Sequence, residues 1–188
     1  MNSVTYVLHE EDVDYCVLID CGEWETLKPV LEKIGKKVRA VLLTHAHTDH
    51  IYGINKLIET FPNALIYTNA EGEKGLQNPQ WNLSRYHYDI EDFIISSPQN
   101  VRVIDKEGSL QVDDDIMVEV LFTPGHEPSC LSFIIENNLF TGDAYIPGIG
   151  TVVSFPRSYK ISAQKTLKRL QYLEKKGLTV CAGHRIIK

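Results

Sequence analysis

The sequence predicts one α/β domain over residues 1–188, and three observations lead to this class. Strand-like and helix-like runs alternate along the chain, as in folds that pack helices on sheets. Hydrophobic residues make up 43% of the chain and charged residues 23%, which is typical of a globular protein. A length of 188 residues is enough to bury one substantial core. The pattern leaves room for two similar halves, each β-rich and then helical.

The first half predicts two strands and then alternating helices and strands. The runs SVTYVLH and YCVLIDCG are typical of strands. A helix is expected next, where four apolar residues recur on one face: Leu27, Val30, Leu31 and Ile34. VRAVLLT predicts a buried strand and ALIYT another. Between them, a second helix is marked by Ile54, Leu57, Ile58 and Phe61.

The second half begins with an irregular, aromatic-rich segment over residues 78–100, NPQWNLSRYHYDIEDFIISSPQN, which is too long for a routine connection and is a candidate functional loop. VRVI, IMVEVLFT, CLSFIIE and NLFTGD then predict closely spaced strands, with an Asn-Asn turn between the last two. A helix is expected over residues 162–175, and LTVCAGH predicts a closing strand. Four residues of that helix should face the core: Ala163, Leu167, Leu170 and Leu173.

Charge and composition favour a small-molecule substrate over a nucleic acid or a membrane. The formal charge is −6, whereas binding a polyanion takes a basic surface. No apolar run approaches the ~20 residues that span a bilayer, and the first residues lack the features of a signal peptide, so we expect a cytoplasmic protein. The four cysteines lie far apart without a C-x-x-C pair and are expected to be reduced: Cys16, Cys21, Cys130 and Cys181.

The stretch THAHTDH concentrates three of the seven histidines in six positions directly after a predicted strand. His45, His47, Asp49 and His50 therefore lie at the carboxyl end of that strand, where open α/β sheets place their ligand sites. Neutral imidazole and carboxylate are ligands that Zn²⁺ or Fe²⁺ prefers. Four donors so close in sequence cannot all reach one ion, so a second metal is inferred.

Three further candidate ligands lie in the same kind of place. His126 follows a strand and a Pro-Gly turn, Asp143 follows a strand and a glycine, and His184 follows the last strand. Each alone is more often a surface or turn residue. Their shared position at strand ends beside glycine favours a common metal site.

These motifs carry a resemblance to a known family. THAHTDH at 44–50, TPGH at 123–126 with Ser129, FTGD at 140–143 and AGH at 182–184, preceded by LIDCG at 18–22, resemble the metallo-β-lactamase superfamily and within it the short hydroxyacylglutathione hydrolase (glyoxalase II-like) branch. The resemblance implies a four-layer αββα sandwich of two mixed β-sheets with outer helices. It also implies a dinuclear metal site, with Zn²⁺ expected and Fe or Mn as alternatives.

The resemblance also implies a role for each residue of the site. It assigns His45, His47 and His126 to one metal and Asp49, His50 and His184 to the other, with Asp143 bridging both. Asp20 would orient a metal-binding histidine. Asp49 would orient a hydroxide that bridges the metals and attacks a thioester, small ester or lactone.

Substrate contacts are expected from the loop at 78–100 and from the strand end after Asp143. Trp81, Tyr86 and Tyr88 are either contacts or packing residues, whereas His87 is left outside the site. Tyr145 is a candidate pocket wall or hydrogen-bond donor.

Departures from the branch argue against glutathione as the recognised thiol. Thr151 stands where that branch tends to carry a basic residue, and the nearest cations are Arg157 and Lys160. The closing motif is altered as well, at Ala182 and Arg185.

The sequence is also compatible with other functions. A mononuclear iron oxidoreductase resembling persulfide dioxygenases would leave part of the second site unused, and a non-catalytic protein on this fold would have lost ligands. Both are disfavoured because all seven candidate ligands are present. β-Lactam hydrolysis, nuclease and phosphodiesterase activity are further alternatives.

Overall fold

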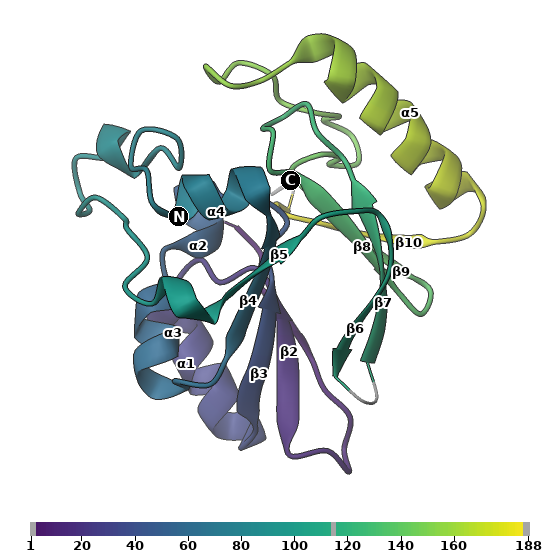
Figure 1. Ribbon diagram of the computed structural model, residues 1–188. Coiled ribbons are helices and arrows are strands. Elements are labelled where there is room, and N and C mark those ends of the chain that lie inside the picture. Colours follow the sequence, from purple (N-terminus) through teal and green to yellow (C-terminus); the bar gives the residue numbers. More distant parts are fainter. Residues whose placement is uncertain (1–2, 114–115, 186–188) are drawn as a thin grey trace.

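The computed structural model describes residues 3–113 and 116–185, and their strands form two five-stranded sheets (Figure 1). The first sheet has the order β1-β2-β3-β4-β5. Its strands are β1 (Tyr6–Leu8), β2 (Tyr15–Ile19), β3 (Lys37–Leu42), β4 (Leu65–Asn69) and β5 (Val101–Ile104). The second sheet has the order β10-β9-β8-β7-β6. Its strands are β6 (Gly108–Asp113), β7 (Ile116–Phe122), β8 (Leu131–Ile135), β9 (Asn138–Gly142) and β10 (Thr179–Ala182).

Both sheets are mixed. In the first, β1 pairs antiparallel with β2, and the remaining neighbours are parallel. In the second, only the pair of β9 and β10 is parallel. Because β7, β9 and β10 consequently run the same way, their carboxyl ends meet at one edge of that sheet.

Helices cover the outer face of each sheet (Figure 1). The helices beside the first sheet are α1 (Trp24–Ile34), α2 (Thr48–Ile51), α3 (Ile54–Thr60) and α4 (Ala70–Leu76). The second sheet is covered by α5 (Lys160–Lys175). Two single 3₁₀ turns, Ser84–Tyr86 and Pro98–Asn100, interrupt the otherwise irregular segment over residues 78–100. The predicted αββα sandwich is thus confirmed.

Three apolar clusters lie between the four layers, and β2 shows how strand periodicity separates them. Cys16 and Leu18 point into the cluster under α1 and α3, whereas Val17 and Ile19 point into the cluster between the sheets. This alternation follows from the two-residue period of a strand that is covered on both faces. A third cluster, which includes Leu170, lies between the second sheet and α5.

Several elements differ from the sequence predictions. Strand β6 and helix α4 were not predicted: β6 lacks a strong apolar pattern, and α4 contains two glycines and no apolar stripe. The predicted second helix is divided into α2 and α3. Val30 was predicted on the buried face of α1 but is 45% exposed, because Leu27 and Leu31 already fill the contact with the sheet. The four cysteines are free, as expected.

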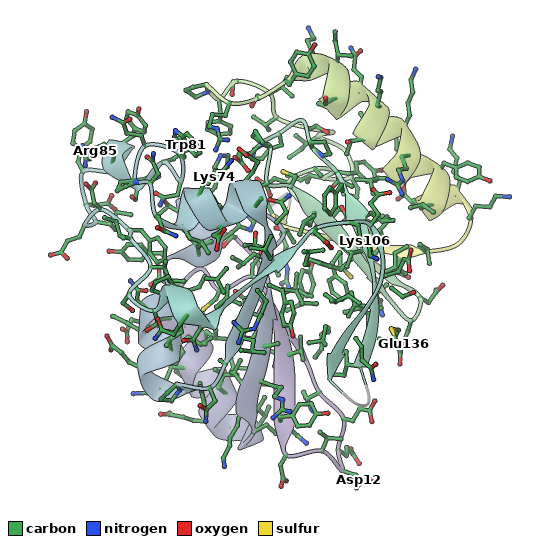
Figure 2. The ribbon with its side chains drawn as sticks, viewed as in Figure 1. Asp12, Lys74, Trp81, Arg85, Lys106 and Glu136 are labelled. Carbon is green, nitrogen blue, oxygen red and sulfur yellow. The ribbon has the colours of Figure 1, made fainter. Side chains whose placement is uncertain are left out.

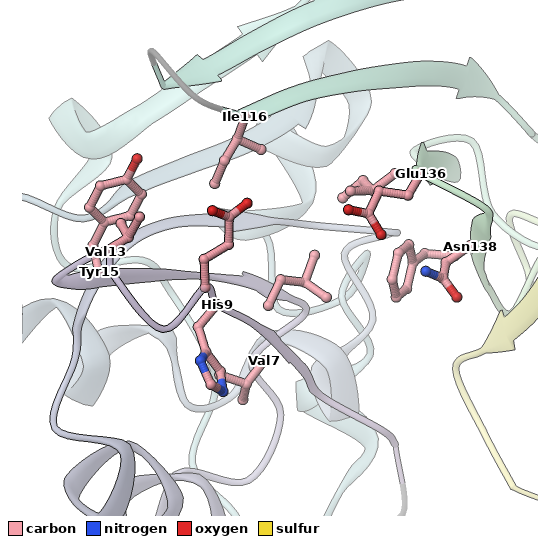
Figure 3. A pocket seen from close by; sticks show the side chains of 11 residues that line it. Val7, His9, Val13, Tyr15, Ile116, Glu136 and Asn138 are labelled. Carbon is pink, nitrogen blue, oxygen red and sulfur yellow. The ribbon is translucent and has the colours of Figure 1, made fainter.

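The two ends of the sandwich differ in chemistry. The carboxyl ends of the parallel strands carry the candidate site described below. At the opposite end, a cavity of about 290 Å³ opens between the sheets, and its lining is largely apolar but includes Glu10 and Glu136 (Figure 3). None of the candidate ligands lines this cavity. Within residues 3–113 and 116–185, no helix is long and apolar enough to cross a membrane.

Candidate metal centre

The seven candidate ligands come from four strand ends that meet at one edge of the sandwich. The loop after β3 supplies His45 and His47, and α2 begins directly afterwards with Asp49 and His50 in its single turn. The remaining three follow the parallel strands of the second sheet: His126 after β7, Asp143 after β9 and His184 after β10. The two sheets are joined here, because the Leu131 N–H donates to the Thr44 carbonyl at 2.7 Å.

The structure brings all seven residues together into overlapping triads. In each triad, one ligand atom per residue lies within 4.8 Å of the others. The triads are His45 with His47 and His126, His45 with His50 and Asp143, and Asp49 with His50 and His184. The first and third match the two ligand sets that the resemblance implies.

Asp143 lies between these two sets. One carboxylate oxygen, Oδ2, is 3.7 Å from His126 Nε2 and 3.3 Å from His184 Nε2. The other, Oδ1, is 3.5 Å from His50 Nε2. A carboxylate that faces both groups of histidines has the position required of a bridging ligand.

Two ring nitrogens and one carboxylate oxygen at the centre have no protein partner although they are buried. His45 Nε2, His50 Nε2 and Asp143 Oδ1 are solvent-inaccessible and make no hydrogen bond. Leaving such groups unpaired costs free energy, so buried polar atoms are nearly always satisfied. Neutral imidazole and carboxylate with inward-facing orphan atoms fit divalent transition-metal ions as the missing partners.

Hydrogen bonds on the far side of the rings fix which nitrogen faces inward. His126 Nδ1 donates to the Val152 carbonyl at 2.7 Å, which leaves Nε2 for the centre. His50 Nδ1 donates to Asp20 Oδ2 at 2.8 Å and likewise presents Nε2. Partners of this kind hold the tautomer and orientation of metal-binding histidines.

Asp20 has the geometry expected of a residue that orients a ligand. Besides His50, its carboxylate accepts from the Thr44 N–H at 2.7 Å and from the Thr44 hydroxyl at 2.8 Å. Its backbone has φ 61°, a conformation that aspartate tolerates better than most residues. Burial opposes the charged form of His50, but the Asp20 carboxylate beside it raises the His50 pKa well above its usual value.

The remaining pKa shifts divide the centre into two parts. Burial lowers the pKa of His45 well below its usual value and that of His47 to about 3. Hydrogen bonds to Asp143 and Asp49 raise the pKa of His184 to about 10. Burial alone would raise the pKa of Asp143, but the hydrogen bond from His184 helps to hold it below its usual value. Without metal, the histidines of the first triad are therefore neutral, whereas His50 and His184 in the triad with Asp49 are protonated.

Sequence reasoning missed a buried acid that supports the histidine loop. Glu127 is 1% exposed, and its carboxylate accepts from both the N–H and the hydroxyl of Ser129. The Ser129 Oγ in turn accepts from the Ala46 N–H at 3.0 Å, between two of the histidines. The only signal in the sequence was the position of Glu127 beside His126. A turn acid in that position gives no indication that it points inward.

Tyr145, which was predicted to contact the substrate, lies away from the candidate metal centre. It belongs to the cluster beneath α5, is 6% exposed, and its hydroxyl donates to Glu174 at 2.8 Å. Tyr145 therefore does not form the wall of a pocket at the centre. The chain turns into this cluster directly after Asp143, since Ala144 belongs to it as well. Tyr88 is fully exposed, and His87 is exposed as well.

Two aromatic residues lie nearer to the centre. Phe155 was not predicted, and its ring meets those of His47 and His126 edge-on, at centroid distances of 5.0 and 5.3 Å. Trp81 lies beside His47 in the wall of a groove and is stacked under the Arg157 guanidinium.

At one edge of its αββα sandwich, the chain gathers histidine and aspartate side chains that could hold metal ions. Residues 1–184 match the metallo-beta-lactamase superfamily, and the chain belongs to that superfamily.

Among curated relatives, the chain is 30% identical over 155 residues to a hydroxyacylglutathione hydrolase of Francisella philomiragia, covering 81% of this chain and 51% of the relative. The chain thus spans about half the length of that relative. Its structure is similar to that of the BLEG-1 B3 metallo-beta-lactamase, with a TM-score of 0.84 and 24% identity, covering 99% of this chain and 88% of the other. It is also similar to TTHA1623 in a di-iron-bound form, with a TM-score of 0.78 and 26% identity, covering 97% and 87%.

Proposed function

We propose that the chain is a dinuclear metal-dependent hydrolase that acts on a thioester or a related small ester or lactone. The observation that carries the proposal is the position of Asp143, within 4 Å of histidines from both outer triads. A single-metal protein has no need of a second complete triad. The similarity to hydroxyacylglutathione hydrolases supports a thioester as the substrate class.

His45, His47 and His126 would hold one divalent ion and Asp49, His50 and His184 the other, with Asp143 shared. We propose Zn²⁺ as the resident metal, with Fe and Mn as alternatives. When bound, such a pair supplies a water of lowered pKa as nucleophile and a Lewis acid for the substrate carbonyl.

The chain's own residues supply orientation. The side chain of Asp49 is 27% exposed and lies 3.2 Å from His184 Nε2, so its carboxylate is at the open side of the centre. There it can accept a hydrogen bond from the attacking water and so orient its lone pair. Asp20 holds His50, and Glu127 with Ser129 holds the backbone between His45 and His47.

We further propose a small-molecule substrate and a cytoplasmic location. The formal charge of −6 and the small groove described below support the first. Neither nucleic acid nor membrane is expected as a partner.

The test is hydrolysis by metal-loaded protein of a panel of thioesters, lactones and β-lactams, with metal content measured on the same sample. We expect turnover of at least one thioester. If fully loaded protein hydrolyses only β-lactams, or only phosphodiesters added to the panel, the proposed substrate class is wrong.

A further inference from the structure

A groove of about 200 Å³ leads from the first triad to the loop at 78–100. It is lined mainly by aromatic and aliphatic side chains, with His47 at one end: His47, Gln80, Trp81, Leu83, Tyr86, Phe155, Pro156 and Arg157. Phe155 touches two histidines of the centre edge-on, so a molecule whose reacting carbonyl lies at the centre would extend along this groove. Tyr86 is 59% exposed and offers free aromatic surface.

Arg157 is the cationic side chain among the residues that line the groove, and acidic side chains already balance its charge. One terminal nitrogen of the Arg157 guanidinium donates to Glu127 at 3.0 Å and the other to Glu71 at 2.6 Å. The guanidinium carbon also lies 3.9 Å from the centroid of the Trp81 ring. Glu127 is buried, which makes this pair a fixed part of the wall. The positive charge of Arg157 therefore serves to balance the charges of Glu127 and Glu71.

The neighbouring cations are paired in the same way. Lys74 on α4 lies 2.6 Å from Glu71, and Arg85 forms a two-pronged ion pair with Asp92. Figure 2 shows Lys74, Trp81 and Arg85 at the same end of the molecule, on α4 and the adjoining loop. A carboxylate entering the groove would lose water and meet cations that already have partners, at a cost in free energy.

We infer that this groove selects substrates whose arm next to the reacting carbonyl is uncharged and apolar, aromatic above all, and discriminates against anionic arms such as that of glutathione. The inference rests on the proposed function and specifies its substrate class. Offset and edge contacts with Trp81, Tyr86 and Phe155 would hold an aromatic ring. Thr151 lies outside this groove, and its hydroxyl donates to the Ala144 carbonyl.

A matched pair of substrates tests the inference: the acetyl thioester of benzyl mercaptan and the same compound with a 4-carboxylate on the ring. Both compounds carry the same acetyl group, so they differ only in the thiol arm. Acetyl is too small to fill the groove, which leaves the groove to the thiol arm. We expect kcat/KM to be about tenfold or more higher for the neutral compound, mainly through KM. Equal values, or a preference for the carboxylate, would overturn the inference.

The role of ion pairing can be tested by Glu71→Gln. This substitution at a half-buried residue removes the charged partner of one Arg157 nitrogen and of Lys74, so it should reduce the preference for the neutral substrate about threefold or more. The matched control is Glu25→Gln, which breaks the exposed pair with Lys56 at 2.7 Å, and neither of these two residues lines the groove. The control should keep the wild-type ratio. An identical ratio in all three proteins would show that ion pairing does not set the preference.

Binding without turnover separates this inference from the proposed function. N-benzylacetamide and its 4-carboxylate are amide counterparts of the two substrates and can be titrated into metal-free protein by calorimetry. Tighter binding of the neutral amide, weakened by Tyr86→Ala, supports the groove assignment even if no thioester is hydrolysed, in which case only the proposed function fails. Tighter binding of the carboxylate would refute the groove assignment even in an active hydrolase.

Discussion

Asp143 is the residue on which both halves of the centre depend. Its two oxygens face His50 on one side and His126 and His184 on the other. We expect Asp143→Asn to lower kcat at least about a hundredfold on every substrate, because the shared negative charge is lost. Steady-state kinetics with metal analysis measures this effect.

The control is Tyr145→Phe, which removes a hydroxyl bonded to Glu174 beneath α5. It should lower the free energy of unfolding by about 1 kcal/mol and leave both kinetic constants unchanged. Wild-type kcat in Asp143→Asn would contradict the assigned role.

At the scale of elements, the strand ends are held together by close backbone packing. Gly142 has φ 49°, and a Cβ there would lie 2.3 Å from the Thr44 hydroxyl oxygen, directly before Asp143 and His45. We expect Gly142→Ala to lower the free energy of unfolding by about 2–3 kcal/mol and to weaken metal binding, since it forces the two strand ends apart. Urea unfolding and equilibrium dialysis against metal give the two quantities.

Gly108→Ala is the matched control. Gly108 also has a positive φ, of 118°, but a Cβ at this position would have no neighbour within 4 Å, so only the backbone cost of about 1–2 kcal/mol applies. Metal affinity should stay unchanged there. If both variants bind metal as the wild type does, close packing at Gly142 does not position the centre.

The elements that sequence could and could not predict differ in a physical way. The α/β class and the grouping of the seven candidate ligands were accessible because periodicity marks buried strands and because parallel strands end at one edge, whereas the αββα sandwich was implied by the family resemblance. Helix α4 was not, since Gly72 and Gly75 break its apolar pattern while allowing it to pack against Thr68 and Ala46. The direction of a side chain after a turn was not accessible either. Tyr145 lies in the core, whereas Phe155 contacts the ring of His47 and Glu127 accepts from Ser129 beneath the histidine loop.

For the whole molecule, loading with metal should release protons. Without metal, the pKa of His184 is raised to about 10, by its hydrogen bonds to Asp143 and Asp49, and that of His50 lies well above its usual value, so both are protonated at neutral pH. His45, His47 and His126 have lowered pKa values and are neutral. We therefore expect the ligand side chains to release about two protons per chain at pH 7, both on filling the set that contains Asp49, in addition to any proton lost by metal-bound water.

The measurement is calorimetric titration of metal in buffers of different ionisation enthalpy. Because the ligand forms of His50 and His184 are neutral, affinity at their site should fall as pH falls, while the first triad changes less. Release of no protons at pH 7 would contradict this division of the centre.

The central claim is that one chain holds two metal ions in a shared site, and metal stoichiometry tests it most directly. Wild type and His50→Ala are saturated with Zn²⁺, freed of excess metal and compared by elemental analysis. We predict close to two ions per chain in the wild type and about one in His50→Ala, since the substitution removes one set and leaves His45, His47 and His126 intact. One ion per chain in both proteins would contradict the claim.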